Sequence, residues 1–261
     1  MNTNFGFDLK WLSVTCFELR FDGMTVVTDP YITECQCTEL TYEDVEACDA
    51  ICLTHAHWDH VTDIPRLMER FQPRIYCAEM SALPLLEWLD CNPIRLYPMP
   101  AGTELDFGYV KIRAVYGHHG NLKNNWSDLK KRLEGNPLCQ KDPGLAGMQV
   151  AGTLEYRNWL FELPGGKRIV LWNNQLGHEH LCACKALRPD VLILQRPGNE
   201  EGAEKCAAFA KEVGCKVLIP HHQDFRKIDD PAILNRMGEL FVEQVPDGIF
   251  INPKHGEWIH L

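Results

Sequence analysis

The chain has 261 residues, of which 45% are hydrophobic and 24% are charged, and its formal net charge at pH 7 is −10. This composition is ordinary for a globular protein, and no stretch approaches the roughly 20 apolar residues that span a membrane. The acidic balance argues against a broad phosphate-binding surface, because affinity for nucleic acids depends largely on Lys and Arg side chains.

These features predict one domain over residues 1–261 that associates with neither nucleic acid nor membrane. The N-terminus lacks a basic region followed by an apolar region and a small-residue cleavage site, which predicts a cytoplasmic location. The 12 cysteines are scattered through a core-rich chain, as reduced thiols are. Whether the chain forms a homo-oligomer is left open by the sequence.

The first elements are strands that lead into a cluster of histidines. Residues 12–28 alternate as strands do around a turn at Asp22 and Gly23, which predicts a hairpin. An acidic, turn-rich connection follows, and then the short apolar strand ICLT at 51–54, which runs into HAHWDH at 55–60. Thr62 or Asp63 can cap the next helix, so the cluster is expected to be a loop between a strand and a helix.

Two more predicted strands end in histidines. A strand at 74–77, a helix at 81–89 and two strand-like segments lead to His118 and His119. Residues 121–147 break the pattern and are interpreted as an insertion near the active site. Strands are then predicted at 148–157, 158–163 and 168–174, with a helix from about Glu179 and two further strand and helix units. The strand at 216–220 ends in His221 and His222.

Seven of the 11 histidines therefore fall in three groups, each directly after a predicted strand. Because strand ends at one edge of a sandwich converge, we expect these groups to meet in space. His55 and His57 are two residues apart, so in extended backbone their imidazoles project to the same side and can bind one ion. A third nitrogen from His118 or His119 completes the open three-histidine arrangement of catalytic zinc, while Asp59 and His60 can serve a neighbouring ion.

The same motifs carry a family resemblance. The run THAHWDH matches the H-x-H-x-D-H signature of the metallo-β-lactamase superfamily, and VVTDP, AVYGHH and LIPHHQDF recur around it in the right order. Over most of its length the chain resembles this superfamily, and within it the branch that contains ascorbate-6-phosphate lactonase and the N-acyl-phosphatidylethanolamine phospholipase D enzymes. The resemblance implies an α/β fold, a four-layer αβ/βα sandwich, and it is far more specific for fold and metal binding than for substrate.

Carried over position by position, the resemblance implies two sets of ligands. His55, His57 and His119 would bind the first ion, and Asp59, His60 and His222 the second. His119 is preferred to His118, and His222 to His221, which leaves His118 and His221 as candidates for supporting or substrate-facing positions. Asp29 looks like the family's buried acid that orients the cluster through hydrogen bonds, although a simple turn aspartate before proline is an equal interpretation.

One position departs from the family pattern. Where members usually carry an aspartate that bridges two ions, the run RIVLWNNQLGH places Asn174. A neutral amide offers one oxygen and no charge, so the second ion is expected to bind weakly or not at all. The expected cofactor is zinc, as one or two divalent ions, with manganese and iron as alternatives. Nearby HEHLCAC, at 178–184, would form a separate soft metal site on a strand, whereas the family's helix would scatter its ligands.

The leading hypothesis is a metal-dependent hydrolase of the lactonase, esterase or phosphodiesterase type. The ions would lower the pKa of bound water, and the resulting hydroxide would attack a small polar or anionic ester, lactone or phosphodiester. Asp59 is the candidate for orienting this hydroxide or accepting its proton. Arg196 is a candidate clamp for an anionic group, against the alternative of a solvated loop arginine. The rivals are a noncatalytic metal-binding or sensing protein, motivated by Asn174, and a phosphodiesterase or nuclease-like member.

Overall fold

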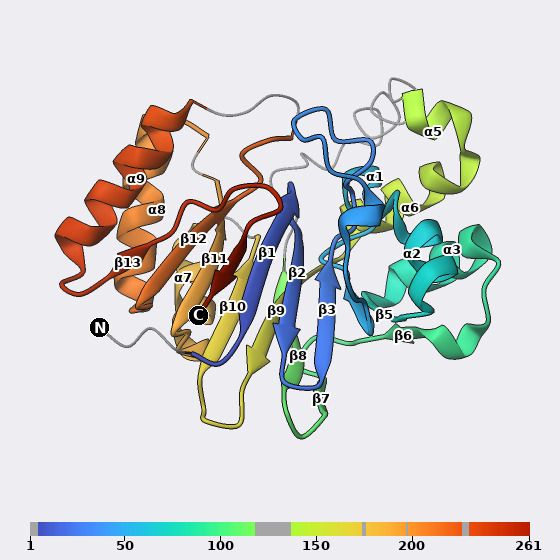
Figure 1. Ribbon diagram of the computed structural model, residues 1–261, viewed down its shortest axis with the longest axis horizontal. Coiled ribbons are helices and arrows are strands. Elements are labelled where there is room, and N and C mark those ends of the chain that lie inside the picture. Colours follow the sequence, from blue (N-terminus) through green and yellow to red (C-terminus); the bar gives the residue numbers. More distant parts are fainter. Residues whose placement is uncertain (1–4, 118–136, 174–175, 197, 226–229) are drawn as a thin grey trace.

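Two β-sheets lie face to face between two groups of helices in the computed structural model, which describes residues 5–117, 137–173, 176–196, 198–225 and 230–261 (Figure 1). Within these residues each sheet has seven strands, in the orders β14-β1-β2-β3-β4-β5-β6 and β13-β12-β11-β10-β9-β8-β7. The strands are β1 (Asp8–Ser13), β2 (Cys16–Phe21), β3 (Met24–Thr28), β4 (Ala50–Cys52), β5 (Arg74–Cys77), β6 (Leu96–Pro98), β7 (Glu104–Asp106), β8 (Lys111–Gly117), β9 (Tyr156–Glu162), β10 (Arg168–Trp172), β11 (Val191–Gln195), β12 (Val217–His221), β13 (Ile249–Phe250) and β14 (Trp258–His260).

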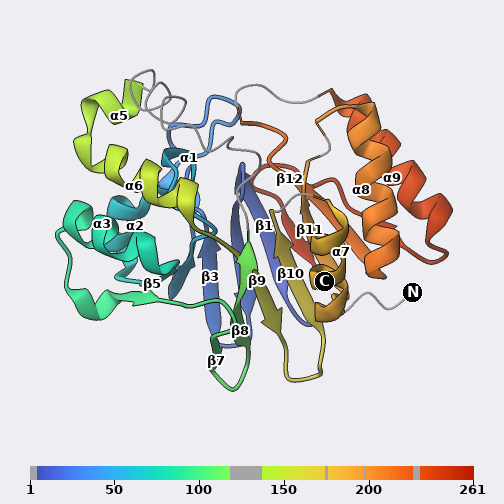
Figure 2. The ribbon, with the colours of Figure 1, turned by 180° about the vertical axis from the view of Figure 1, so that it is seen from behind.

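Helices cover the outer face of each sheet, which gives the four-layer αβ/βα sandwich that the resemblance implies (Figures 1 and 2). The helices are α1 (Trp58–Val61), α2 (Ile64–Phe71), α3 (Glu79–Leu89), α5 (Pro137–Lys141), α6 (Pro143–Leu154), α7 (His178–Leu187), α8 (Glu200–Val213) and α9 (Pro231–Gln244). Helices α2, α3 and α6 pack on the first sheet, and α8 and α9 pack on the second. None of the described helices is both long and apolar enough to cross a membrane.

The layers follow from the two-residue period of strands, because successive side chains point to opposite faces. Val26 contributes to the core between the two sheets, and its neighbour Val27 contributes to the core under α2 and α3. In the second sheet Leu192 faces α8 and α9, whereas Ile193 faces the first sheet. Strands buried on both faces read as continuous apolar runs, as the central strands of this chain do.

The hairpin predicted in the first thirty residues is confirmed, but the strand predicted at 148–157 is wrong over most of its length. Residues 143–154 form α6, and β9 begins only at Tyr156. Pro143 occupies the first turn, and the Asp142 carboxylate accepts a hydrogen bond from Gly144 N, which are helix-start signals. Leu145, Met148 and Gly152 are buried at a helical spacing. The segment interpreted as an insertion at 121–147 therefore continues into a helix that extends past its expected end, while residues 118–136 lie outside the described part.

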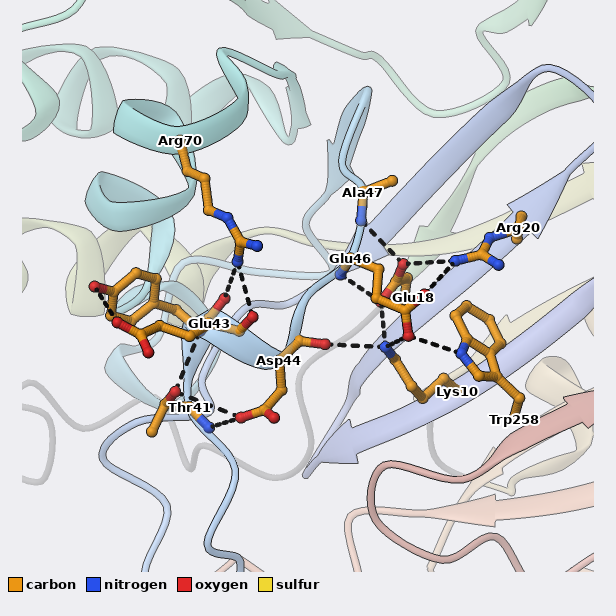
Figure 3. Close-up of polar contacts among 11 residues, drawn as sticks. Lys10, Glu18, Arg20, Thr41, Glu43, Asp44, Glu46, Ala47, Arg70 and Trp258 are labelled. Atoms are coloured by element: carbon orange, nitrogen blue, oxygen red, sulfur yellow. Dashed lines mark hydrogen bonds and ion pairs between the residues drawn. The ribbon is translucent and has the colours of Figure 1, made fainter.

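A buried ion pair holds the first strands to the connection that precedes β4. Lys10 and Glu18 are 3% and 0% exposed, and Lys10 Nζ lies 2.9 Å from Glu18 Oε2. Figure 3 shows Lys10 between Glu18 and Glu46 and also donating to Asp44 O. Glu18 in turn accepts from the backbone N–H groups of Glu46 and Ala47 at 3.2 and 3.1 Å. These contacts fix the acidic connection against β1 and β2.

Candidate metal centre

Residues that follow three strands meet at one edge of the sandwich. Asp29 comes directly after β3, the cluster of residues 55–60 follows β4, and His222 follows β12. Strands β3 and β4 are parallel, as are β10, β11 and β12, so their carboxyl ends point the same way. The topology of both sheets therefore directs polar side chains to a common place, at the top of Figure 1.

Asp59, His60 and His222 form a compact group of potential metal ligands. Their ligand atoms lie within 4.8 Å of one another, and no other group of three or more such residues occurs in the described part of the chain. His60 Nε2 is 3.5 Å and His222 Nε2 is 3.9 Å from Asp59 Oδ2. Asp59 and His60 lie in the short helix α1, so the second half of the cluster is helical and the expectation of a simple loop is wrong there.

Asp29 contacts this group. Its carboxylate is fully buried and accepts from His60 Nδ1 at 2.8 Å and from the backbone N–H of Thr54 at 2.7 Å. The Thr54 hydroxyl donates to the same carboxylate at 2.5 Å. Because Nδ1 of His60 is engaged by Asp29, Nε2 is the nitrogen left to face Asp59 and an ion. Asp29 therefore makes the hydrogen bonds that an orienting acid would make, and it also adopts a left-handed backbone with φ of 38°, so both interpretations stay predictions.

The charges in the group favour a cation. Burial alone would lower the pKa of His60, but the nearby carboxylates of Asp29 and Asp59 outweigh it and raise this pKa to about 10. Burial likewise opposes ionisation of Asp59, yet His60, His57 and His222 hold the pKa of this carboxyl well below its usual range. Burial lowers the pKa of His222 to about 4, with Asp59 acting in the opposite direction. Two buried carboxylates thus face imidazoles, an environment in which a divalent ion can replace a proton.

His55 and His57 lie beside this group. The ring centroid of His55 is 4.3 Å from that of His57 and 4.0 Å from that of His60. The Thr54 hydroxyl is 3.0 Å from Nδ1 of His55, and the Thr153 hydroxyl is 2.8 Å from Nε2 of His57. The two histidines are therefore neighbours, as their spacing predicts, and α6 reaches His57 through Thr153.

Helix α6 approaches the cluster so closely that one position requires glycine. A Cβ atom added to Gly152 would lie 2.8 Å from Ala56 N and 2.9 Å from Cδ2 of His57. We expect Gly152→Ala to displace His57 and to lower the free energy of unfolding by about 1–3 kcal/mol, as overpacking does. Metal affinity measured by calorimetry should fall at the same time. Gly147→Ala is the matched control on the same helix, since a Cβ there meets nothing within 4 Å.

The other predicted site residues either do not belong to the group of Asp59, His60 and His222 or fall outside the described part of the chain. His221 is fully buried beside Phe17 and is not one of the three residues of the ligand group; burial and the neighbouring His222 lower its pKa well below the usual value. Arg196 is partly buried, and its positive charge contributes to the lowered pKa of His222, as a nearby cation does. Three predicted residues fall outside the described part: His118, His119 and Asn174.

The structure also reveals residues near the centre that the sequence did not indicate. Tyr156, the first residue of β9, is buried with its ring centroid 4.5 Å from that of His55. Burial raises the pKa of Tyr156 well above its usual value, so its hydroxyl stays protonated beside the site. Thr54 and Thr153 contact His55 and His57 through their hydroxyls. A buried Tyr or Thr has no distinctive sequence spacing, so only the fold could identify these neighbours.

The alternative soft metal site at 178–184 is wrong. These residues form α7 rather than a strand, so residues two apart do not share a face. His178 Nε2 and Cys182 Sγ, one helical turn apart, are 3.7 Å from each other. Cys184 is buried in the core under the second sheet, away from that pair.

Comparisons with known proteins agree with this geometry. A family model described as beta-lactamase superfamily domain matches residues 8–222. A protein of Geobacillus sp. described as a UPF0173 metal-dependent hydrolase is 31% identical over 249 residues, which cover 94% of this chain and 95% of the relative. A metallo hydrolase of the archaeon Ignicoccus hospitalis has a similar structure, with a TM-score of 0.71, 17% identity and 97% of each chain covered. An isothiocyanate hydrolase from Delia radicum gut bacteria has a TM-score of 0.68 and 14% identity, covering 97% of this chain and 99% of that one.

Proposed function

Because the chain belongs to the beta-lactamase superfamily, we propose that it is a metal-dependent hydrolase acting on a small polar or anionic ester, lactone or phosphodiester. The observation that carries the proposal is the group of Asp59, His60 and His222, with ligand atoms within 4.8 Å of one another. The description of the Geobacillus relative as a metal-dependent hydrolase supports it. Zinc is the proposed ion, with manganese or iron as alternatives, because imidazole and carboxylate ligands suit all three.

The residues present fit such an ion. Asp59, His60 and His222 would hold one ion, and Asp29 backs His60 in the way that a carboxylate commonly supports a ligating histidine. His55, whose ring lies against that of His60, and its neighbour His57 would hold a further ion together with His119, as the family resemblance implies. Gly117, the last described residue before His118, pairs with Tyr156, whose ring contacts His55.

A divalent ion bound here supplies a water of lowered pKa and polarises the carbonyl or phosphoryl oxygen of the substrate. The chain's own residues would orient the water and bind the substrate. Asp59 is buried and ionised, so its carboxylate can accept a hydrogen bond from the attacking water and orient it. Arg196, near His222, is the proposed partner of an anionic substrate group, since guanidinium matches carboxylate and phosphate geometry. Helix α6 covers His57 through Thr153 and limits access of bulk water from that side.

The proposal is tested with purified protein that has been stripped of metal and reconstituted separately with zinc, manganese or iron. A panel of anionic and neutral lactones, aryl esters and phosphodiesters is then assayed. We expect hydrolysis of at least one anionic member, lost on chelation and restored by the ion. Tight metal binding without turnover of any member would instead favour the noncatalytic alternative that Asn174 suggests.

A further prediction concerns the position that usually bridges two ions. Asn174→Asp restores a carboxylate there, which adds a negative charge between two cations and reduces their repulsion. We expect the variant to bind more metal per chain than the wild type when both are dialysed against equal low zinc, measured by atomic emission. Asn235→Asp on α9 is the control for the added charge, since Asn235 is exposed and does not belong to the ligand group. An unchanged count in Asn174→Asp would show that residue 174 is not the bridging position.

A further inference from the structure

The backbone of His222 is held in an unusual conformation. His222 has φ of 66°, in the left-handed region that residues other than glycine rarely adopt and that persists only where the surroundings impose it. Its side chain nevertheless points Nε2 toward Asp59, at 3.9 Å. Something outside the ligand group must therefore fix the backbone that presents this imidazole.

The turn between β1 and β2 provides that constraint. Val14, at the turn, is itself left-handed with φ of 38° and is fully buried. Its carbonyl accepts from His222 N at 2.8 Å, and its N–H donates to the Asp224 carboxylate at 2.8 and 3.1 Å. The two ends of the segment 222–224 thus hydrogen-bond to the backbone C=O and N–H groups of Val14. These bonds fix the backbone of the segment at both ends.

Asp224 is held in turn by a residue near the C-terminus. It is fully buried, and His255 Nε2 lies 2.8 Å from its Oδ2. An ionised carboxylate only accepts hydrogen bonds, so His255 donates here. The His255 ring stacks on Trp11 of β1, with ring centroids 4.0 Å apart and 21° between planes. His255 therefore joins Asp224 to the same strand that carries the Val14 turn.

We propose that Asp224 and His255 are positioning residues that set the orientation of His222 and so the affinity of the site formed by Asp59, His60 and His222. This inference rests on the proposed function, because it assigns a ligand role to His222. The connection runs from His255 to the Asp224 carboxylate, from there to Val14, and from Val14 to the backbone of His222. Neither positioning residue belongs to the ligand group itself. Supporting residues of this kind commonly change metal affinity by about 10–100-fold when they are replaced.

The test uses His255 rather than Asp224, because removing the buried carboxylate leaves the Val14 N–H without its acceptor and endangers folding. His255→Phe keeps an aromatic ring over Trp11 but cannot donate to Asp224. His255→Gln restores a donor of similar reach. His260→Phe is the matched control, since His260 also contacts an aspartate at 2.8 Å, Asp8, but is 79% exposed. The full-length wild type and these three variants are titrated with Co²⁺, followed by calorimetry and by the visible absorption of the bound ion. The same titration of His60→Ala identifies the binding step that belongs to the site, because that step is lost in this variant.

We expect His255→Phe to weaken Co²⁺ binding at that step by about 10–100-fold and to change its absorption spectrum. His255→Gln and His260→Phe should match the wild type in both. Equal affinity and spectrum in His255→Phe and wild type would overturn the inference, as would an equal loss in His260→Phe. If the wild type itself binds no ion at this group, the proposed function fails and the inference fails with it, a result visible before any substitution is compared.

Discussion

Replacing His55 and His57 together by alanine is expected to abolish hydrolysis. The His55 ring lies against the rings of both His57 and His60, and loss of the two imidazoles removes two proposed ligands of an ion. Loss of an ion that stabilises charge in the transition state costs several kcal/mol, so kcat/KM should fall by about a thousandfold or more. The measurement is kcat/KM toward the best substrate of the panel, together with metal content per chain.

The matched control is the double variant His178→Ala and His180→Ala. These histidines are also two residues apart, but they lie on α7 and do not belong to the ligand group. The control should keep wild-type metal content and kcat/KM. Full activity in the His55 and His57 double variant would refute a hydrolase that depends on this centre.

The largest expected effect on stability comes from Lys10. Lys10→Met removes the buried ion-pair partner of Glu18 and leaves only the more distant Arg20, at 3.5 Å. Breaking a buried pair from one side costs about 3–5 kcal/mol, because the remaining charge is uncompensated. Urea unfolding followed by circular dichroism should show this loss. Adding Glu18→Gln to Lys10→Met should recover part of it, since a neutral amide oxygen can still accept from the N–H groups of Glu46 and Ala47.

Arg20→Met is the comparison for the second prediction. Arg20 also approaches Glu18, at 3.5 Å, but its side chain is 39% exposed. Because the Arg20 side chain keeps contact with water, its pair with Glu18 contributes about 0–1 kcal/mol, and this variant should unfold near the wild-type urea concentration. Equal losses in Lys10→Met and Arg20→Met would show that burial of the pair is not what matters.

The fold was largely readable from the sequence because a short motif and the strand pattern agreed. The H-x-H-x-D-H run at 55–60 indicated the superfamily, and the matching family model confirms that assignment. The particular branch stays a prediction. The failures were local. Residues 148–154 look like a strand when taken alone, and the burial of Leu145, Met148 and Gly152 on one helical face became visible only with the tertiary structure. Similarly, the helical turn of α1 is too short to show a period.

The sequence could predict those residues of the candidate site whose type suits a metal ligand. His60 and the pair His221 and His222 were picked out by their places after strands, the resemblance favoured His222 of that pair, and the structure brings His60 and His222 together with Asp59. Asp29 had two equal interpretations, because its hydrogen-bond partners Thr54 and His60 lie 25 and 31 residues away. The positions of Tyr156 and Gly152 beside the site, and the hydrogen bonds of His222 and Asp224 to Val14, could not be predicted. Each depends on close approach of segments that share no motif.

The most direct test of the account is anomalous diffraction at the zinc edge from crystals of the wild-type protein grown with zinc. The account predicts a peak about 2.0–2.2 Å from one oxygen of Asp59 and from the Nε2 atoms of His60 and His222, the ordinary lengths of such bonds. A second peak beside His55 and His57 would add the other proposed ion. Crystals saturated with zinc that show no peak among these residues, or a peak only beside His178 and Cys182, would contradict the account.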